Sequence, residues 1–240
     1  MILNCKGLNY TEINKSIRKA IEDGEKEVVM NNINGQGYLF AGVKNGIRAI
    51  INGVPGNDLG GMMDGPNIFV NSNIQDCVGN TMNNGKIVVH GDAGDILGYA
   101  MRGGKIFVKG KVGYRCGIHM KAFGEKIPVI VIGEDAGDFL GEYMASGIIV
   151  VLCKNKTKLE SNYIGVGMHG GAIYIRGNVD EYNLGKGVSV SPLDEWDINF
   201  LTNVLNEYST DMNSKEKYDL NSFVKLSPLN SRPFQRLYSY

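Results

Sequence analysis

The stretch KIVVHGDAGDILGYAMRGG, residues 86–104, and the stretch KIFVKGKVGYRCGIHM, residues 105–120, share one pattern of residue types. In each stretch a lysine is followed by a short run of β-branched or aromatic residues. Further along, a glycine, Gly98 or Gly117, has a methionine three positions after it. This glycine recurs at steps of 19, 19, 19, 24 and 24 residues, at Gly60, Gly79, Gly98, Gly117, Gly141 and Gly165. A fixed order of features at a nearly constant period indicates an internal repeat.

The other columns of the repeat have a physical meaning. Six of the ten methionines follow these glycines, at Met63, Met82, Met101, Met120, Met144 and Met168. When the six repeats are aligned on this glycine, one repeat per row, an apolar residue or Cys116 precedes each glycine. Asn or Asp stands three positions before it in five of the six rows. Asn and Asp favour turns, and glycine tolerates left-handed backbone. Each row therefore predicts one short strand followed by tight turns.

A period near 20 residues with one strand per row predicts an all-β fold, a single-stranded right-handed parallel β-helix of about seven coils, with short capping helices at both ends. The methionine column is then a stack of thioethers in an interior corner. The L-x-x-L-x-L spacing of leucine-rich repeats is missing, as is the aliphatic residue at every sixth position of left-handed hexapeptide helices.

The segments on either side of the repeat predict the caps. Residues 1–45 contain a helix that Thr11 could cap, with a helical apolar face ending at Gly24, and then strands that lead into the β-helix of residues 46–190. In residues 191–240, Ser191 followed by Pro192 reads as a helix start. Because an open solenoid end exposes unpaired strand edges, both helices are expected to cover ends.

The C-terminal tail is polar at its start and rich in aromatic and basic residues at its end. One interpretation is an arm that docks on a partner through Phe234, Arg236, Tyr238 and Tyr240. The other is a tail that wraps around its own solenoid.

Composition and charge exclude several classes of function. Lys+Arg and Asp+Glu are equal, 25 against 25, so the sequence predicts no nucleic-acid partner and no anionic membrane surface. The apolar runs are too short to span a bilayer, and the N-terminal residues lack the features of a secretory signal, so a cytoplasmic location is expected. Cysteines 5, 77, 116 and 153 form no C-x-x-C motif and are expected to be buried hydrophobes.

No catalytic, cofactor-binding or metal-binding residue is predicted. The chemically suggestive side chains all fall in repeat columns, which favours structural roles: His119, His169, Asp92, Asp95, Asp135, Asp138, Cys116, Arg102 and Arg115. The histidines share columns with unlike residues, which indicates solvent-facing rim positions. The aspartates occupy turn columns, Cys116 lies in the apolar column, and the arginines lack a helix N-terminus or basic cluster that would complete an anion site.

The stretch YIGVGMHGG, residues 163–171, matches the G-x-G-x-x-G dinucleotide fingerprint. That fingerprint requires a helix directly after the glycines, whereas Gly171 is followed by AIYIRG, which reads as a strand. Gly165 and Met168 already belong to repeat columns. We therefore interpret the loop as another solenoid turn.

The aligned rows resemble the C-terminal domain of the glutamate synthase large subunit, the GXGXG domain, here in a free-standing form. They are also similar to the subunit of formylmethanofuran dehydrogenase in which the same repeat occurs. The resemblance covers residues 30–190 and rests on these stretches: Asn57-Asp58-Leu59-Gly60, Gly79-Asn80-Thr81, Glu142-Tyr143-Met144, Ser146-Gly147, Ile148–Leu152 and Asn162 through Gly171.

This resemblance implies a non-catalytic scaffold subunit of a glutamate synthase-like complex, which transfers the amide nitrogen of glutamine to 2-oxoglutarate. Glutaminase-like and FMN-binding synthase subunits or domains would be its partners, with FMN and iron–sulfur clusters on those partners and no cofactor in this chain. The sequence agrees, since Met1 is followed by Ile2 and Cys5 lies too far in for a processed N-terminal nucleophile.

Three alternatives to this interpretation stay open from the sequence. The chain could be a scaffold of the same kind in a formylmethanofuran dehydrogenase complex, or a stand-alone β-helix enzyme with a groove site. A dinucleotide-binding oxidoreductase is the interpretation that the fingerprint alone would favour. Homo-oligomerisation is compatible with each of these.

Overall fold

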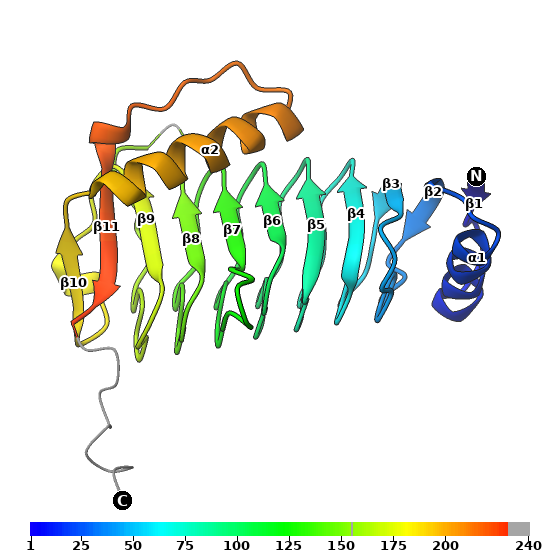
Figure 1. Ribbon diagram of the computed structural model, residues 1–240, viewed down its shortest axis with the longest axis horizontal. Helices are drawn as coiled ribbons and strands as arrows, with labels where there is room; N and C mark the ends of the chain where they lie inside the picture. The colour runs from blue at the N-terminus through cyan, green and yellow to red at the C-terminus, as the bar shows by residue number, and fades with distance from the viewer. Residues whose placement is uncertain (155, 230–240) are drawn as a thin grey trace, which may run out of the picture.

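The computed structural model describes residues 1–154 and 156–229, which form a parallel β-solenoid of about seven turns (Figure 1). A single sheet of 11 strands has the order β1-β2-β3-β4-β5-β6-β7-β8-β9-β11-β10. The strands β1 to β9 pair in parallel, and β11 and β10 pair in antiparallel fashion. The predicted all-β fold, a parallel β-helix with few helices, is confirmed.

The described residues form short strands, two α-helices and two 3₁₀ helices. The strands are β1 (Ile2–Asn4), β2 (Glu27–Asn34), β3 (Arg48–Val54), β4 (Asp64–Val70), β5 (Asn84–Val89), β6 (Lys105–Val108), β7 (Val129–Ile132), β8 (Ile148–Val151), β9 (Ala172–Arg176), β10 (Val188–Ser191) and β11 (Phe223–Pro228). The helices are α1 (Tyr10–Glu22) and α2 (Glu195–Asp211), and two short 3₁₀ helices are η1 (Glu181–Asn183) and η2 (Leu220–Ser222). None of the helices in the described part of the chain is long and apolar enough to cross a membrane.

Two ladders of apolar side chains fill the solenoid. One consists of inward-facing residues aligned across the strands: Ile68, Ile87, Ile106, Ile130, Ile149 and Ile173. The other is the methionine column, in which each side chain is fully or almost fully buried. The glycines lie between the two ladders: a Cβ at Gly117 would stand 2.5 Å from Cδ1 of Ile149. Close packing thus excludes a side chain from this column.

Each glycine turn has left-handed φ at three positions. The glycines themselves have φ of 67–72°. The residues two positions earlier have φ of 57–63°: Asp58, Cys77, Ile96, Arg115, Phe139 and Tyr163. The residues two positions later are Met62, Thr81, Ala100, His119, Tyr143 and Gly167, and their φ runs from 48 to 70°. Gly167 therefore occupies a position where glycine is the least strained residue, which the repeat alone did not reveal.

Hydrogen bonds between coils hold these left-handed residues in place. The N–H of Gly117 donates to the carbonyl of Leu97 in the preceding coil at 2.8 Å. The N–H groups of Arg115 and His119 donate to carbonyls of the following coil, at 2.9 and 3.0 Å. A non-glycine residue in left-handed conformation costs about 1–2 kcal/mol. The backbone bonds to both neighbouring coils offset that cost.

Helix α1 caps the N-terminal end of the solenoid, as predicted. Its N-cap is Asn9, in a capping box with Glu12, rather than Thr11, because the chain turns into the helix two residues earlier. Its apolar face buries Ile13 and Ile17 against the first coil. Asn14 accepts from the N–H of Phe40 at 3.0 Å, the bond that a carbonyl of a preceding coil makes at later turns, and it donates to the carbonyl of Tyr38 at 2.9 Å.

Replacing Asn14 by alanine is expected to lower the free energy of unfolding by about 1–2 kcal/mol, because both backbone groups of the first turn lose their side-chain partner. Urea denaturation followed by circular dichroism measures this change. The neighbouring Lys15→Ala is the control, since no hydrogen bond of Lys15 is present among the described residues. A loss no larger than that of the control would contradict the capping role of Asn14.

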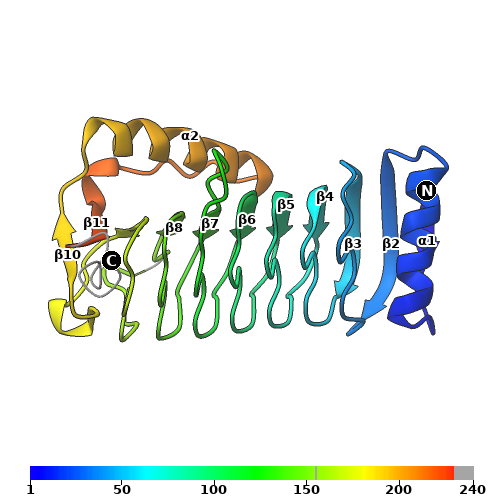
Figure 2. The same cartoon turned by 60° about the horizontal axis from the view of Figure 1, so that its bottom comes forward.

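The C-terminal end corrects the expectation that a helix covers it. Helix α2 instead lies along the outside of the sheet (Figures 1 and 2), where it packs on an outward-facing apolar column: Val88, Phe107, Val131, Val150 and Tyr174. The antiparallel strands β11 and β10 extend the sheet at that end. Ser191 belongs to β10, and the N-cap of α2 is Asp194. Because the outward column is apolar, its burial under α2 contributes more free energy than covering the end of the sheet would.

A candidate protein-interaction edge

Aromatic and basic side chains line the outside of the glycine turns over four successive coils. We call this set, Tyr99, Arg115, His119, Phe139, Tyr143 and Tyr163, the aromatic edge. The rings of Phe139 and Tyr163 stack with centroids 4.8 Å apart and planes at 13°. Those of His119 and Tyr143 stack at 5.3 Å and 11°, and Tyr99 meets His119 edge-on at 6.0 Å.

The left-handed turns create this arrangement. Within one turn, the residues two before and two after the glycine point outward, while the residue immediately before the glycine and the methionine point inward. Consecutive coils are about 4.8 Å apart, so equivalent outward side chains meet face to face. Phe139 and Tyr163 belong to the earlier of these positions, and His119 and Tyr143 to the later. The edge is thus a direct product of the repeat.

A charged pair lies in the middle of the edge. Nε of Arg115 is 2.9 Å from Oε2 of Glu142, whose side chain is only 12% exposed. The guanidinium of Arg115 also lies over the ring of Phe139, 4.6 Å from its centroid. A cation over an aromatic face adds about 0.5–1 kcal/mol at exposed sites. Both contacts orient Arg115, so that its guanidinium continues the stack of Phe139 and Tyr163 into the preceding coil.

The edge has the composition of a protein-binding surface. Tyr163 is 56% exposed and Tyr143 is 49% exposed, although both carry large apolar rings. Tyrosine and arginine are enriched among the residues that dominate binding energy at protein interfaces. Rings already held by stacking lose little side-chain freedom on binding. The arrangement suits burial against another polypeptide.

The acidic turn residues take part in contacts between coils. Asp92 accepts a hydrogen bond from the N–H of Lys111 in the next coil at 2.8 Å. Asp95 and Asp138 accept in the same way from Tyr114 and Asn162, also at 2.8 Å. Asp135 pairs with Lys156. In the described ranges, no group of three or more His, Cys, Asp and Glu side chains is placed to hold a metal ion.

The remaining singled-out residues also lie in the repeat. Cys116 is buried, and burial raises the pKa of its thiol, which disfavours the reactive thiolate. Burial, together with the charge of Asp135, raises the pKa of Cys153 to about 11. The guanidinium of exposed Arg102 lies 4.5 Å from the ring centroid of Phe123. His169 is half-buried, outside the aromatic edge.

The fingerprint-like loop is a solenoid turn, as predicted, because Gly171 is followed at once by β9. His119 does face solvent, as predicted for a rim position, but its part in the edge was not foreseen. The proposed anchors Phe234, Arg236, Tyr238 and Tyr240 lie outside the described residues.

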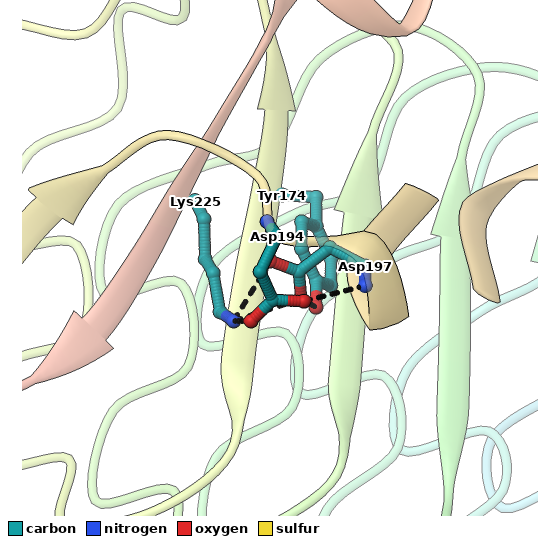
Figure 3. Close-up of polar contacts among 4 residues, drawn as sticks. All are labelled: Tyr174, Asp194, Asp197 and Lys225. Carbon is teal, nitrogen blue, oxygen red and sulfur yellow. Dashed lines mark hydrogen bonds and ion pairs between the residues drawn. The ribbon is translucent and has the colours of Figure 1, made fainter. Parts of the chain in front are cut away.

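A buried polar cluster fixes the start of α2 to the sheet (Figure 3). Asp197 is fully buried and accepts a hydrogen bond from the hydroxyl of Tyr174 in β9 at 2.5 Å. Nζ of Lys225 in β11 lies 2.8 and 2.9 Å from the two carboxylate oxygens of Asp197, and 3.4 Å from Oδ2 of Asp194. The N–H of Asp194 donates to Asp197 and completes a capping box. The cluster attaches α2 to two strands.

The protonation states of this cluster agree with a structural role. Burial would raise the pKa of Asp197, but the hydrogen bonds from Lys225 and Tyr174 outweigh it and hold that pKa below its usual value. Burial and the neighbouring Asp197 raise the pKa of the Tyr174 hydroxyl. One signal of this cluster is visible in the sequence, a lone aspartate on the apolar face of a helix, although the repeat drew no attention to it.

The other end of α2 is attached by ion pairs. Nζ of Lys86 in β5 lies 2.6 Å from Oδ2 of Asp211 and 3.2 Å from Oε1 of Glu207. Lys105 in β6 also pairs with Glu207. Tyr208 packs edge-on against Phe107, with ring centroids 5.7 Å apart, and donates its hydroxyl to the carbonyl of Val108 at 3.1 Å. Helix α2 is therefore fixed to strands β5 through β9.

The fold and this edge define a parallel β-solenoid protein whose surface suits binding to another polypeptide. More particularly, the chain belongs to the GXGXG family: the family model described as the GXGXG motif matches residues 11–228.

Similar proteins include one relative by sequence and one by fold. An uncharacterised protein of Methanocaldococcus jannaschii is 41% identical over 251 residues, which cover 100% of this chain and 96% of that protein. A solved structure of the formyltransferase/hydrolase complex of Methylorubrum extorquens, with methylofuran, contains a chain with a TM-score of 0.61. That chain is 20% identical, and the match covers 80% of this chain and 70% of that one. At this identity the likeness concerns the fold.

Proposed function

We propose that this protein is a non-catalytic scaffold subunit of a glutamate synthase-like complex. In that role the glutaminase and synthase chemistry, with FMN and iron–sulfur clusters, resides on partner subunits. The cytoplasm is the expected location. The resemblance of the repeat to the glutamate synthase C-terminal domain motivates this choice of complex.

The aromatic edge is the observation that carries the scaffold role. It combines half-exposed tyrosines with a fixed arginine on a rigid turn, and its rings are ordered before any partner arrives. Preordered aromatic side chains favour tight association, because less conformational entropy is lost on binding. Asp92, Asp95 and Asp138, which suggested chemistry, accept backbone hydrogen bonds from the next coil. Asp135 pairs with Lys156, and Cys116 is buried. These features favour a binding role over an enzymatic one.

A second candidate is a scaffold subunit of a formylmethanofuran dehydrogenase complex. The similarity of fold to a chain of a formyltransferase/hydrolase complex favours it. Both candidates use the solenoid as an assembly surface and differ in the partner's chemistry. The stand-alone enzyme with a groove site has no comparable support.

Co-purification of the tagged full-length protein from its native host distinguishes these candidates. We expect stoichiometric recovery of a glutaminase-like and an FMN-binding subunit, and glutamate formation from glutamine and 2-oxoglutarate by the recovered complex in the presence of a reductant. Recovery of formyltransferase-type subunits would favour the second candidate. A chain that elutes free of partners would contradict the scaffold role.

The paired substitution Phe139→Asn and Tyr143→Asn is expected to reduce partner recovery at least tenfold, because it removes a ring from each stacked pair. Asparagine tolerates the left-handed backbone at both positions, so the turns are kept. The matched control is Tyr38→Asn, at the same turn position in the first coil, where Tyr38 is 53% exposed with φ of 57°. Equal recovery with both variants would exclude the aromatic edge as the interface.

A further inference from the structure

The last described residue bonds to the segment that stacks on the last turn of the aromatic edge. Strand β11 runs antiparallel to β9 and ends beside the residues at which β9 begins (Figure 1). The N–H of Leu229 donates to the carbonyl of Gly187 at 2.8 Å, and Pro228 pairs with Val188. A Cβ on Gly165 would stand 3.0 Å from the Val188 side chain. The chain therefore leaves the described fold one layer beyond the turn that carries Tyr163.

The segment that follows is long enough to run the length of the edge. Residues 230–240, NSRPFQRLYSY, number 11 and reach about 36–40 Å when extended. The edge runs from the coil of Tyr99 to that of Tyr163, three steps of about 4.8 Å, or roughly 14 Å. Even a partly compact segment starting at Leu229 spans this distance.

The chemistry of the segment complements the edge. Phe234, Leu237, Tyr238 and Tyr240 are the apolar and aromatic groups that stacked, half-exposed rings accept. Arg232 and Arg236 match a column of carboxylates beside the edge, Asp76, Asp95 and Asp138. Among the described residues, none of these three carboxylates forms an ion pair. Each uses Oδ1 or its backbone in bonds to the adjacent coil.

We propose that the aromatic edge is the docking site of this chain's own segment 230–240, with its arginines beside the aspartate column. The segment covers the exposed rings while the protein is alone. A partner that binds the same edge displaces the segment. That displacement rests on the proposed function, whereas the docking does not.

Site-specific photo-crosslinking of the isolated full-length protein tests the docking. Tyr163, Tyr143 or, as a control, Tyr38 is replaced by p-benzoylphenylalanine, and crosslinked peptides are identified by mass spectrometry. Unlabelled protein is irradiated in an equal mixture with ¹⁵N-labelled protein. We expect crosslinks from positions 163 and 143 to residues 230–240 within single chains, and none from position 38.

The double substitution Phe234→Ser and Tyr238→Ser is expected to lower the crosslink yield at least fivefold. Peptides that combine labelled and unlabelled halves would overturn the proposal in favour of a second copy of the chain. A complete lack of crosslinks to 230–240 would overturn it as well. Because the protein is tested without partners, failure here leaves the co-purification experiment, and with it the scaffold role, as a separate question.

Discussion

Replacing Gly117 by alanine is expected to lower the free energy of unfolding by about 3 kcal/mol. The glycine has φ of 72°, where an alanine costs about 1 kcal/mol or more. The added Cβ would also stand 2.5 Å from Cδ1 of Ile149 in the packed interior, and overpacking costs about 1–3 kcal/mol. Urea denaturation at fixed pH measures the change in midpoint and slope.

A control and a rescue separate the two causes. Gly124 has φ of 62°, but a Cβ added there would meet no atom within 4 Å, so Gly124→Ala is expected to cost only about 1 kcal/mol. Ile149→Val removes Cδ1, and in combination with Gly117→Ala it should recover part of the loss. A double-mutant cycle gives the coupling between the two sites. Equal losses at Gly117 and Gly124, or no coupling, would contradict the packing argument.

Replacing Asp197 by alanine is expected to lower the free energy of unfolding by about 3–4 kcal/mol. It removes the closer of the two carboxylates that pair with Lys225, leaves the buried Tyr174 hydroxyl without its acceptor, and deletes half of the capping box of α2. Breaking a buried ion pair from one side costs about 3–5 kcal/mol, and losing a cap costs about 1 kcal/mol. Lys105→Met is the control: its 40% exposed side chain makes an ion pair worth less than about 1 kcal/mol.

The pH dependence of that loss gives a second readout. The pKa of Asp197 is held below its usual value in the folded protein, so its stabilisation is complete above the unfolded pKa and is lost as pH falls through the folded value. The difference between the native protein and Asp197→Ala should be constant from about pH 8 to 5 and shrink below about pH 4. A constant difference down to pH 2 would exclude ionised Asp197 as the source.

The repeat made the interior predictable. A column with methionine in every row has one physical explanation, a ladder along the solenoid axis, and all six side chains are indeed buried. The predicted position of α2 was wrong because a helix with a broad apolar face does not tell which surface it covers. The strands contained that information: runs such as Val129–Ile132 are apolar on both faces, which indicates burial on both.

The aromatic edge could not be predicted from the sequence. Arg115 and Phe139 do not favour left-handed backbone, so no local signal places them outward on a turn. The bonds to the coils before and after impose that conformation on whichever residue is present. Likewise, Asn9 and Asp194 cap their helices because of the tertiary positions of the chain, whereas Thr11 and Ser191 matched the capping preference equally well by type.

The position of α2 changes how this molecule unfolds. A bare solenoid behaves as a one-dimensional array, in which each coil senses only its nearest neighbours and melting can start at any point. In helix α2, Asp211 pairs with Lys86 of β5, and Asp197 accepts a hydrogen bond from Tyr174 of β9. The helix thereby links coils that do not contact each other directly. We therefore expect the block from β5 to β9 to open as one cooperative unit. Strands β2 to β4, for which no ion pair or hydrogen bond to α2 is present among the described residues, are expected to fray one coil at a time from the α1 end.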